Sequence, residues 1–165
     1  MHQYITEYLS PLGKVILASD GKDLTGTWFE GQRYFPDISS CIISPQLPVF
    51  IDACSWLNFY FEGRIPSAFT QLSPSGTPFQ QDVWHLLRQI PYGETTTYGK
   101  LALQIARQYG KQHMAAQAIG NAVGHNPISI FIPCHRVIGT THNLTGYAGG
   151  IDRKEALLKL EGAKY

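Results

Sequence analysis

The chain of 165 residues suits one or two small domains with a buried core, and its 44 % hydrophobic content is ordinary for a globular protein. The first ten residues, MHQYITEYLS, lack the basic start and apolar stretch of a signal peptide. No apolar run approaches the roughly 20 residues that span a membrane. We therefore expect a cytoplasmic protein, or a nuclear one in a eukaryote, with no membrane partner.

Three cysteines, Cys41, Cys54 and Cys134, occur without CxxC spacing. This odd and sparse set argues against a disulfide scaffold and favours reduced thiols. His2 and His85 could join Cys41 and Cys54 around a metal ion, but the spacings match no zinc signature. We expect neither a metal site nor a cofactor.

The net charge of +1 conceals an asymmetry between the two halves of the chain. Residues 1–76 carry seven acids and four bases, whereas residues 77–165 carry five acids and nine bases. No Asp or Glu occurs between Thr95 and Ile151. A stretch without carboxylates suits a polyanion such as DNA, because it does not repel phosphates. A modestly basic surface that arises by chance is the alternative.

The N-terminal part is predicted to be strands followed by a helix. β-prone runs at residues 5–9, 15–19 and 24–29 are separated by the turn signals SPLG at 10–13 and Asp20-Gly21.

Apolar residues then recur with helical period from Leu47 to Phe61, and Gly63 ends the helix. Cys54 lies on this apolar stripe, so we interpret it as a buried core thiol. The polar stretch at 71–76 is predicted to be a linker between domains 1–76 and 77–165.

The C-terminal part is predicted to be mostly helical. Thr77 and Gln80 form a capping box for a helix that reaches Ile90. Thr97 caps a second helix over 98–107, and a third is predicted over 114–123.

The turn between the second and third helices contains glycine, and the third helix is rich in Ala and Gly, as in a helix-turn-helix. These small residues allow close approach either to another helix or to DNA.

The segment after these helices carries the most reactive side chain. The β-prone run 128–132 is predicted to be a strand that leads to Cys134. A final helix is predicted from Asp152, with Glu155 closing a second capping box, to about Glu161. Cys134 next to His135 is a candidate nucleophile, since a thiol needs a base or a positive field for activation. From this pair alone, a structural thiol remains the alternative.

A wider set of motifs resembles the O6-alkylguanine-DNA alkyltransferase family. The motifs are Asn126-Pro127, IFIPCHRVI at 130–138, GYAGG at 146–150, SPLG at 10–13, GTWF at 26–29 and GETTTY at 93–98. The resemblance implies an α+β fold, with a small ribonuclease H-like sheet-and-helix domain and a mostly helical domain with a winged-helix-like helix-turn-helix. It also implies direct-reversal DNA repair by a monomer, in which base flipping in double-stranded DNA delivers an O6-alkylguanine to a cysteine that is alkylated once and irreversibly.

By this resemblance, Cys134 is the alkyl acceptor, His135 activates its thiol through a water molecule, and Glu161 orients His135. Tyr98 matches the tyrosine that crowds a phosphate during flipping and hydrogen-bonds the extruded base. These four residues form the expected catalytic set, in a thiol version of a nucleophile, base and orienter.

The resemblance also implies a substrate pocket. Asn126 matches the hinge between the recognition helix and the active-site segment, and Tyr147 and Ala148 match the pocket around the guanine O6. Backbone groups of Cys134 and Val137 would read the base edge. Ala148 departs from the family, which usually has serine at this position.

The expected DNA contacts lie mostly on the third helix: Gln117, Ala115, Ala116 and Gly120, together with Arg136. Gln117 stands where the family usually has an arginine that replaces the flipped base, so flipping is expected to be weaker. A non-catalytic alkylated-DNA binder is the alternative function, although that class lacks the acceptor cysteine. A cysteine hydrolase is a further alternative, which would show turnover without DNA.

Overall fold

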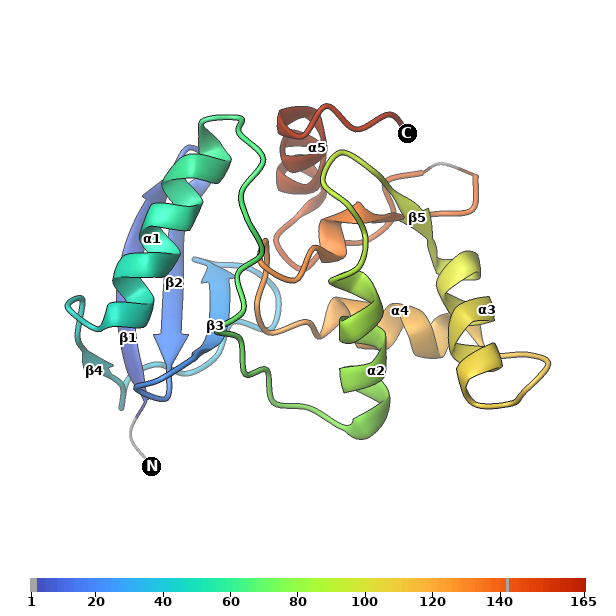
Figure 1. The fold of residues 1–165 in the computed structure, drawn as a ribbon, viewed down its shortest axis with the longest axis horizontal. Helices are drawn as coiled ribbons and strands as arrows, with labels where there is room; N and C mark the ends of the chain where they lie inside the picture. The colour runs from blue at the N-terminus through green and yellow to red at the C-terminus, as the bar shows by residue number, and fades with distance from the viewer. Residues whose placement is uncertain (1–2, 142) are drawn as a thin grey trace. The chain divides into compact units, whose positions relative to one another are not determined.

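The computed structural model describes residues 3–141 and 143–165, so His2, a residue of the possible metal set, lies outside it (Figure 1). The chain divides into two compact units. The first comprises residues up to Ser75 together with Pro127–Ser129, and the second comprises Gly76–Asn126 and Ile130–Tyr165. The sequence placed its boundary at 76/77, one residue from the division at Ser75/Gly76, and did not foresee the return of 127–129 to the first unit.

The first unit contains a four-stranded sheet in the order β3-β2-β1-β4. The strands are β1 (Tyr4–Ser10), β2 (Gly13–Ser19), β3 (Leu24–Phe29) and β4 (Ile42–Ile43). The first three pair antiparallel and match the predicted runs, whereas β4 pairs parallel with β1. The sequence missed β4 because it is a two-residue edge strand with exposed side chains.

Helix α1 (Pro48–Phe61) packs against β1 and β2 of the same unit (Figure 1). Its apolar stripe supplies core residues such as Phe50 and Leu57, as the periodicity predicted. Cys54 is half-buried rather than fully buried, and burial raises the pKa of its thiol. The prediction of a core thiol therefore overstated the burial of Cys54. This residue lies at the margin of the stripe, where the charge of its thiolate would raise the pKa of Tyr8.

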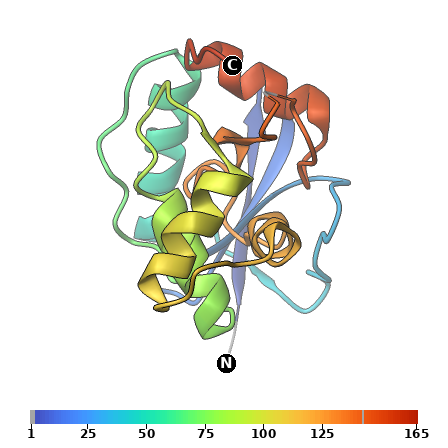
Figure 2. The same cartoon turned by 90° about the vertical axis from the view of Figure 1, so that its right-hand side faces the viewer.

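The second unit is mostly helical, and its first three helices pack against one another (Figure 2). The elements are α2 (Pro78–Leu87), β5 (Thr96–Thr97), α3 (Tyr98–Gln108), α4 (Ala116–Gly124), the 3-10 turn η1 (Cys134–Arg136), β6 (Val137–Ile138) and α5 (Ile151–Leu160). Strands β5 and β6 form a parallel pair.

The N-terminal ends of α2, α3 and α5 test the helix caps that the sequence predicted. Thr77 and Gln80 form the predicted capping box of α2, and the Thr97 hydroxyl accepts the N–H of Lys100 at the start of α3. The predicted capping box of α5 is wrong. Gly150, with φ of 95°, is the N-cap residue, and no side chain caps this helix. A positive φ is cheap for glycine, so the chain turns there without a polar cap.

The predicted strand over 128–132 is also wrong. Within the first unit, Ile128 makes one parallel bridge to Thr27, and the Thr27 hydroxyl donates to the carbonyl of Ser129 at 2.5 Å. The chain then turns at Ile130, whose φ is 74°. A β-branched residue at positive φ cannot continue a strand, so η1 follows a buried turn.

Helix α4 begins at Ala116, two residues after the predicted start, and its N-cap Ala115 offers no side-chain hydrogen bond. Within 3–141 and 143–165, the helices are too short and too polar to cross a bilayer.

Candidate active site

Cys134, the expected nucleophile, begins the 3-10 turn η1 in the second unit and is 6 % exposed. Its backbone N–H donates to the carbonyl of Ile132 at 2.8 Å. The amide of Asn126, at the end of α4, donates to the same carbonyl at 2.7 Å and also hydrogen-bonds the thiol of Cys134. Asn126 therefore ties α4 to the segment that carries the sulfur.

The thiol of Cys134 is not a thiolate at rest. Burial raises its pKa, and this outweighs the hydrogen bond from Asn126, the positive charge of Lys154 and a backbone hydrogen bond, all of which lower it. A protonated thiol is a weak nucleophile. Reaction at this sulfur consequently needs a base that takes the proton.

The imidazole of His135 fits that requirement. Its side chain is fully buried, and its Nε2 lies 2.6 Å from Oε2 of Glu161. An ionised carboxylate only accepts hydrogen bonds, so Nε2 carries a proton, and burial lowers the pKa of His135 and thereby disfavours a second proton on Nδ1. Nδ1 is buried without a hydrogen-bond partner among the described residues. His135 is therefore a neutral imidazole with an unused acceptor.

Glu161, at the C-terminal end of α5, accepts hydrogen bonds from other groups besides His135. Oε1 accepts Nε of Arg136 at 2.8 Å and the N–H of Gly93 at 3.3 Å, and Oε2 accepts Nη2 of Arg136 at 3.1 Å. Burial by itself raises the pKa of Glu161, but the hydrogen bonds from His135 and Arg136 and the positive charge of Arg136 outweigh burial and lower the pKa to about 2. The carboxylate is thus ionised at neutral pH.

Arg136 does not lie where a DNA contact was expected. Arg136 is 9 % exposed. Its Nη1 donates to the carbonyl of Ile90 at 2.7 Å, and its Nε and Nη2 donate to the carboxylate of Glu161. The ring of Tyr92 lies 5.8 Å from its guanidinium carbon. We correct the expectation on this ground: the guanidinium donors already face protein acceptors inside the second unit.

Lys154 is a component that the sequence analysis missed. Its side chain is fully buried, and Nζ donates to the carbonyls of Val137 at 2.5 Å, Thr145 at 2.8 Å and Gly146 at 3.3 Å. Burial lowers the pKa of Lys154 to about 8, so it is mainly charged at neutral pH. A signal was available, because Lys154 shares a helix face with the buried Leu157 and Leu158.

The contacts of Lys154 hold the expected pocket residues in place. Val137 is buried, whereas Tyr147 and Ala148, which follow Gly146, are partly buried. Tyr98, the first residue of α3, is also partly buried, and its hydroxyl hydrogen-bonds the side chain of Thr145. Burial raises the pKa of Tyr98, and the charge of a Cys134 thiolate would raise it further.

The first turn of α4 presents exposed side chains. Ala115, Ala116 and Gln117 are exposed, and a Cβ added at the partly buried Gly120 would meet no atom within 4 Å. The small residues therefore leave this helix surface open to close approach. Gln117 is the one residue of these four that has a long side chain.

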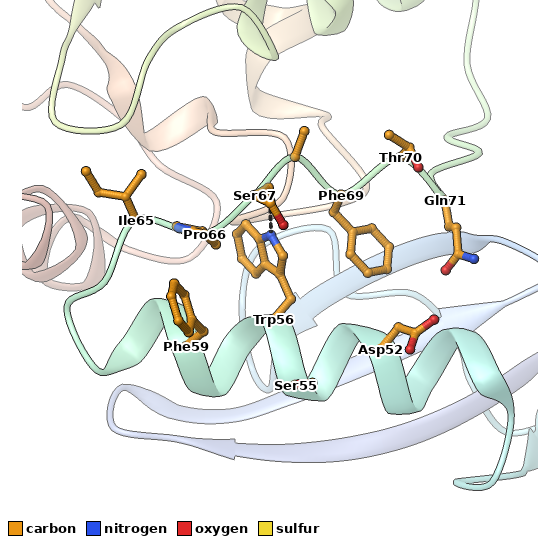
Figure 3. A pocket seen from close by; sticks show the side chains of 11 residues that line it. Asp52, Ser55, Trp56, Phe59, Ile65, Pro66, Ser67, Phe69, Thr70 and Gln71 are labelled. Carbon is orange, nitrogen blue, oxygen red and sulfur yellow. Dashed lines mark hydrogen bonds between the residues drawn. The ribbon is translucent and has the colours of Figure 1, made fainter.

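A separate pocket of about 620 Å³ lies in the first unit, between α1 and the extended segment 65–71 (Figure 3). Trp56 and Phe59 rise from α1 toward this segment, and the Trp56 indole donates to the carbonyl of Ser67 at 2.8 Å. Of the residues that line the pocket, Asp52 alone is ionisable. The predicted chemistry-bearing residues are not among them. In the described part of the chain, no three His, Cys, Asp or Glu residues gather as metal ligands.

Comparisons with known proteins match nearly the whole chain. The family model for the DNA-binding domain of 6-O-methylguanine DNA methyltransferase matches residues 78–163. A methylated-DNA–protein-cysteine methyltransferase of Haemophilus influenzae is 43 % identical over 164 residues, which are 98 % of this chain and 88 % of that protein. The protein of that name from Mycobacterium tuberculosis is 46 % identical over 155 residues, 94 % of this chain and 90 % of that protein.

Solved structures agree with these relatives. The Mycobacterium tuberculosis O6-methylguanine methyltransferase superposes with a TM-score of 0.84 at 44 % identity, covering 97 % of this chain and 93 % of that one. The structure of Mycobacterium tuberculosis OGT in complex with DNA gives a TM-score of 0.82 at 43 % identity, covering 98 % of this chain and 93 % of that one.

The shared carboxylate predicts an acid-dependent stability. Since the folded-state pKa of Glu161, about 2, lies below the ordinary 4.5, the unfolded chain binds this proton more tightly. The stabilisation is complete above pH 4.5 and disappears as the pH falls toward 2. Glu161→Gln should lower the free energy of unfolding by about 3 kcal/mol at pH 7. The difference from the wild type should shrink by about 1 kcal/mol at pH 3.5.

Urea unfolding at the two pH values measures both differences, with the exposed Glu94→Gln as a control that changes stability by less than about 0.5 kcal/mol. An equal loss at pH 7 and pH 3.5 would contradict the assignment of the low pKa to Glu161.

Proposed function

Since the chain belongs to the methylated-DNA–protein-cysteine methyltransferase family, we propose that it repairs O6-alkylguanine in double-stranded DNA by transferring the alkyl group to Cys134. The observation that carries the proposal is the pairing of a buried, protonated thiol with a neutral histidine held by an ionised carboxylate. This arrangement supplies a nucleophile, a base and an orienting group within one unit.

The proposed transfer balances its atoms as follows. The bond between Sγ of Cys134 and the alkyl carbon forms as the bond between that carbon and guanine O6 breaks. The thiol proton passes to His135 through a water molecule and is later released to solvent, and the departing guanine takes up one proton from solvent to regain its neutral form. The products are an S-alkylcysteine and guanine. Because a thioether has no hydrolytic exit, each protein molecule acts once.

The departure of the guanine also requires stabilisation. Negative charge develops on the guanine as the alkyl carbon departs, and nearby donors lower the barrier. The partly buried Tyr98 hydroxyl, whose pKa a charge on Cys134 would raise, is the proposed donor to the extruded base. Tyr147, Ala148 and the backbone at Val137 form the proposed pocket, and Lys154 supports it by bridging three carbonyls around it.

The alkylated base must leave the duplex to reach a buried sulfur. The open first turn of α4 supports DNA contact by Ala115, Ala116, Gln117 and Gly120, with Gln117 filling the gap that the flipped base leaves. We assign α3 and α4 to a winged-helix-like helix-turn-helix, and the sheet with α1 to a ribonuclease H-like topology. These finer assignments rest on the family resemblance.

A non-catalytic binder of alkylated DNA is the second candidate function. It would need the helix surface of α4 but not a reactive thiol. The intact Cys134, together with the hydrogen bond from Asn126 and the buried His135–Glu161 pair, favours transfer over binding alone.

Stoichiometry tests the proposed transfer. Incubated with duplex DNA that contains labelled O6-methylguanine, the protein should take up one methyl group per molecule and then stop. Cys134→Ala should abolish uptake and keep DNA binding, because only the acceptor atom is removed. Cys54→Ala, a change at the half-buried thiol of α1, serves as the control and should transfer normally. Repeated turnover, or label on the Cys134→Ala protein, would exclude the mechanism.

The role of Gln117 predicts different effects on two substrates. Extruding a base costs a few kcal/mol, and a side chain that fills the gap offsets part of this cost. Arginine stacks its planar guanidinium and attracts phosphates, so Gln117→Arg should speed duplex repair and tighten binding, whereas Gln117→Ala should slow it. Neither variant should change the reaction with free O6-alkylguanine base, which needs no flipping. Single-turnover rates on both substrates decide; equal effects on both would remove Gln117 from flipping.

A further inference from the structure

Arg136 forms a buried hydrogen-bond network that takes no direct part in the proposed transfer. Nε and Nη2 hold both oxygens of Glu161, and Nη1 holds the carbonyl of Ile90. This geometry leaves the guanidinium with protein acceptors on two sides. A planar fork that grips a carboxylate in this way is fixed in place and always charged.

The net charge around His135 therefore differs from that of an isolated histidine–carboxylate pair. A lone Glu161 would attract a proton onto His135, because an imidazolium and a carboxylate form a stable ion pair. Arg136 already neutralises this carboxylate. A proton on His135 would leave a net positive charge on a side chain with no exposed surface.

The charged groups around His135 act in opposite directions on its pKa. Arg136 on η1 and Lys154 on α5 disfavour the imidazolium, and Glu161 at the end of α5 favours it. Tyr92, from the loop after α2, stacks near Arg136 and is a neutral phenol whose pKa is raised by burial. The thiol of Cys134 is protonated and adds no charge.

We propose that Arg136 is a positioning residue that neutralises Glu161 and thereby keeps His135 in the uncharged form that accepts the thiol proton. Glu161 thus orients the imidazole without making it permanently cationic. This role rests on the proposed transfer to Cys134, and it replaces the expected contact of Arg136 with DNA.

The test is the pH dependence of alkyl transfer from free O6-benzylguanine, a substrate that involves no DNA contact. Single-turnover rates from pH 5 to 8.5 give the midpoint of the acid limb. In Arg136→Gln, the carboxylate is no longer neutralised, so His135 holds its proton to higher pH. The midpoint should rise by about one pH unit or more. Arg88→Gln removes an exposed cation at the end of α2 and should keep the wild-type midpoint.

Arg136→Lys separates charge from geometry, because it keeps the cation and loses the fork. Its midpoint should stay nearer to the wild type than that of Arg136→Gln. An unshifted midpoint in Arg136→Gln, or an equal shift in Arg136→Lys, would overturn the inference. Absence of methyl transfer by the wild type from O6-methylguanine in duplex DNA would instead sink the proposed function itself.

If Arg136→Gln does not fold, the same substitution is made in Glu161→Gln, where it leaves no unpaired carboxylate. The imidazole of His135 is then titrated by NMR, which does not depend on activity. In Glu161→Gln the charge of Arg136 is no longer balanced, so removing Arg136 as well should raise the pKa of His135 from its value in Glu161→Gln back toward that of the wild type. An unchanged pKa would show that Arg136 does not control the charge of His135.

Discussion

One buried carboxylate connects the parts of the candidate site. Glu161, at the end of α5, accepts hydrogen bonds from His135 and Arg136 on η1 and from the backbone of Gly93 in the loop after α2. Three segments that are distant in sequence consequently meet at two oxygen atoms. A buried anion is stable only when it is paired and hydrogen-bonded, so loss of any of these partners weakens the hold on the others.

The electrostatic result is a site that is uncharged where reaction begins. Burial keeps the thiol of Cys134 protonated, and the pairing of Arg136 with Glu161 leaves His135 neutral. In the proposed transfer, charge separates only when the proton moves from sulfur to imidazole. Lys154 then becomes important, because its ammonium lies close enough to lower the pKa of Cys134 while it braces the carbonyls of Val137 and Thr145.

Local signals in the sequence predicted the parts of the fold that depend on local physics. Alternation and turn residues located three strands, and the polar caps Thr77 and Thr97 located two helix starts. The rest depends on tertiary packing. The positive φ of Ile130 cannot be derived from residue types, and the spacing of Lys154 from Leu157 and Leu158 indicates its helix face but not its complete burial. The resemblance supplied Glu161 as a partner of His135, but the structure was needed to show that Arg136 faces the same carboxylate rather than the surface.

The most direct test of this account is the protonation state of His135, read from the ¹⁵N shifts of its two ring nitrogens by NMR at pH 7. The account predicts a neutral ring with the proton on Nε2, donated to Glu161, and an unprotonated Nδ1 that is ready to accept the thiol proton. A ring protonated on both nitrogens, or on Nδ1 alone, would contradict it, because neither form could act as the base for Cys134.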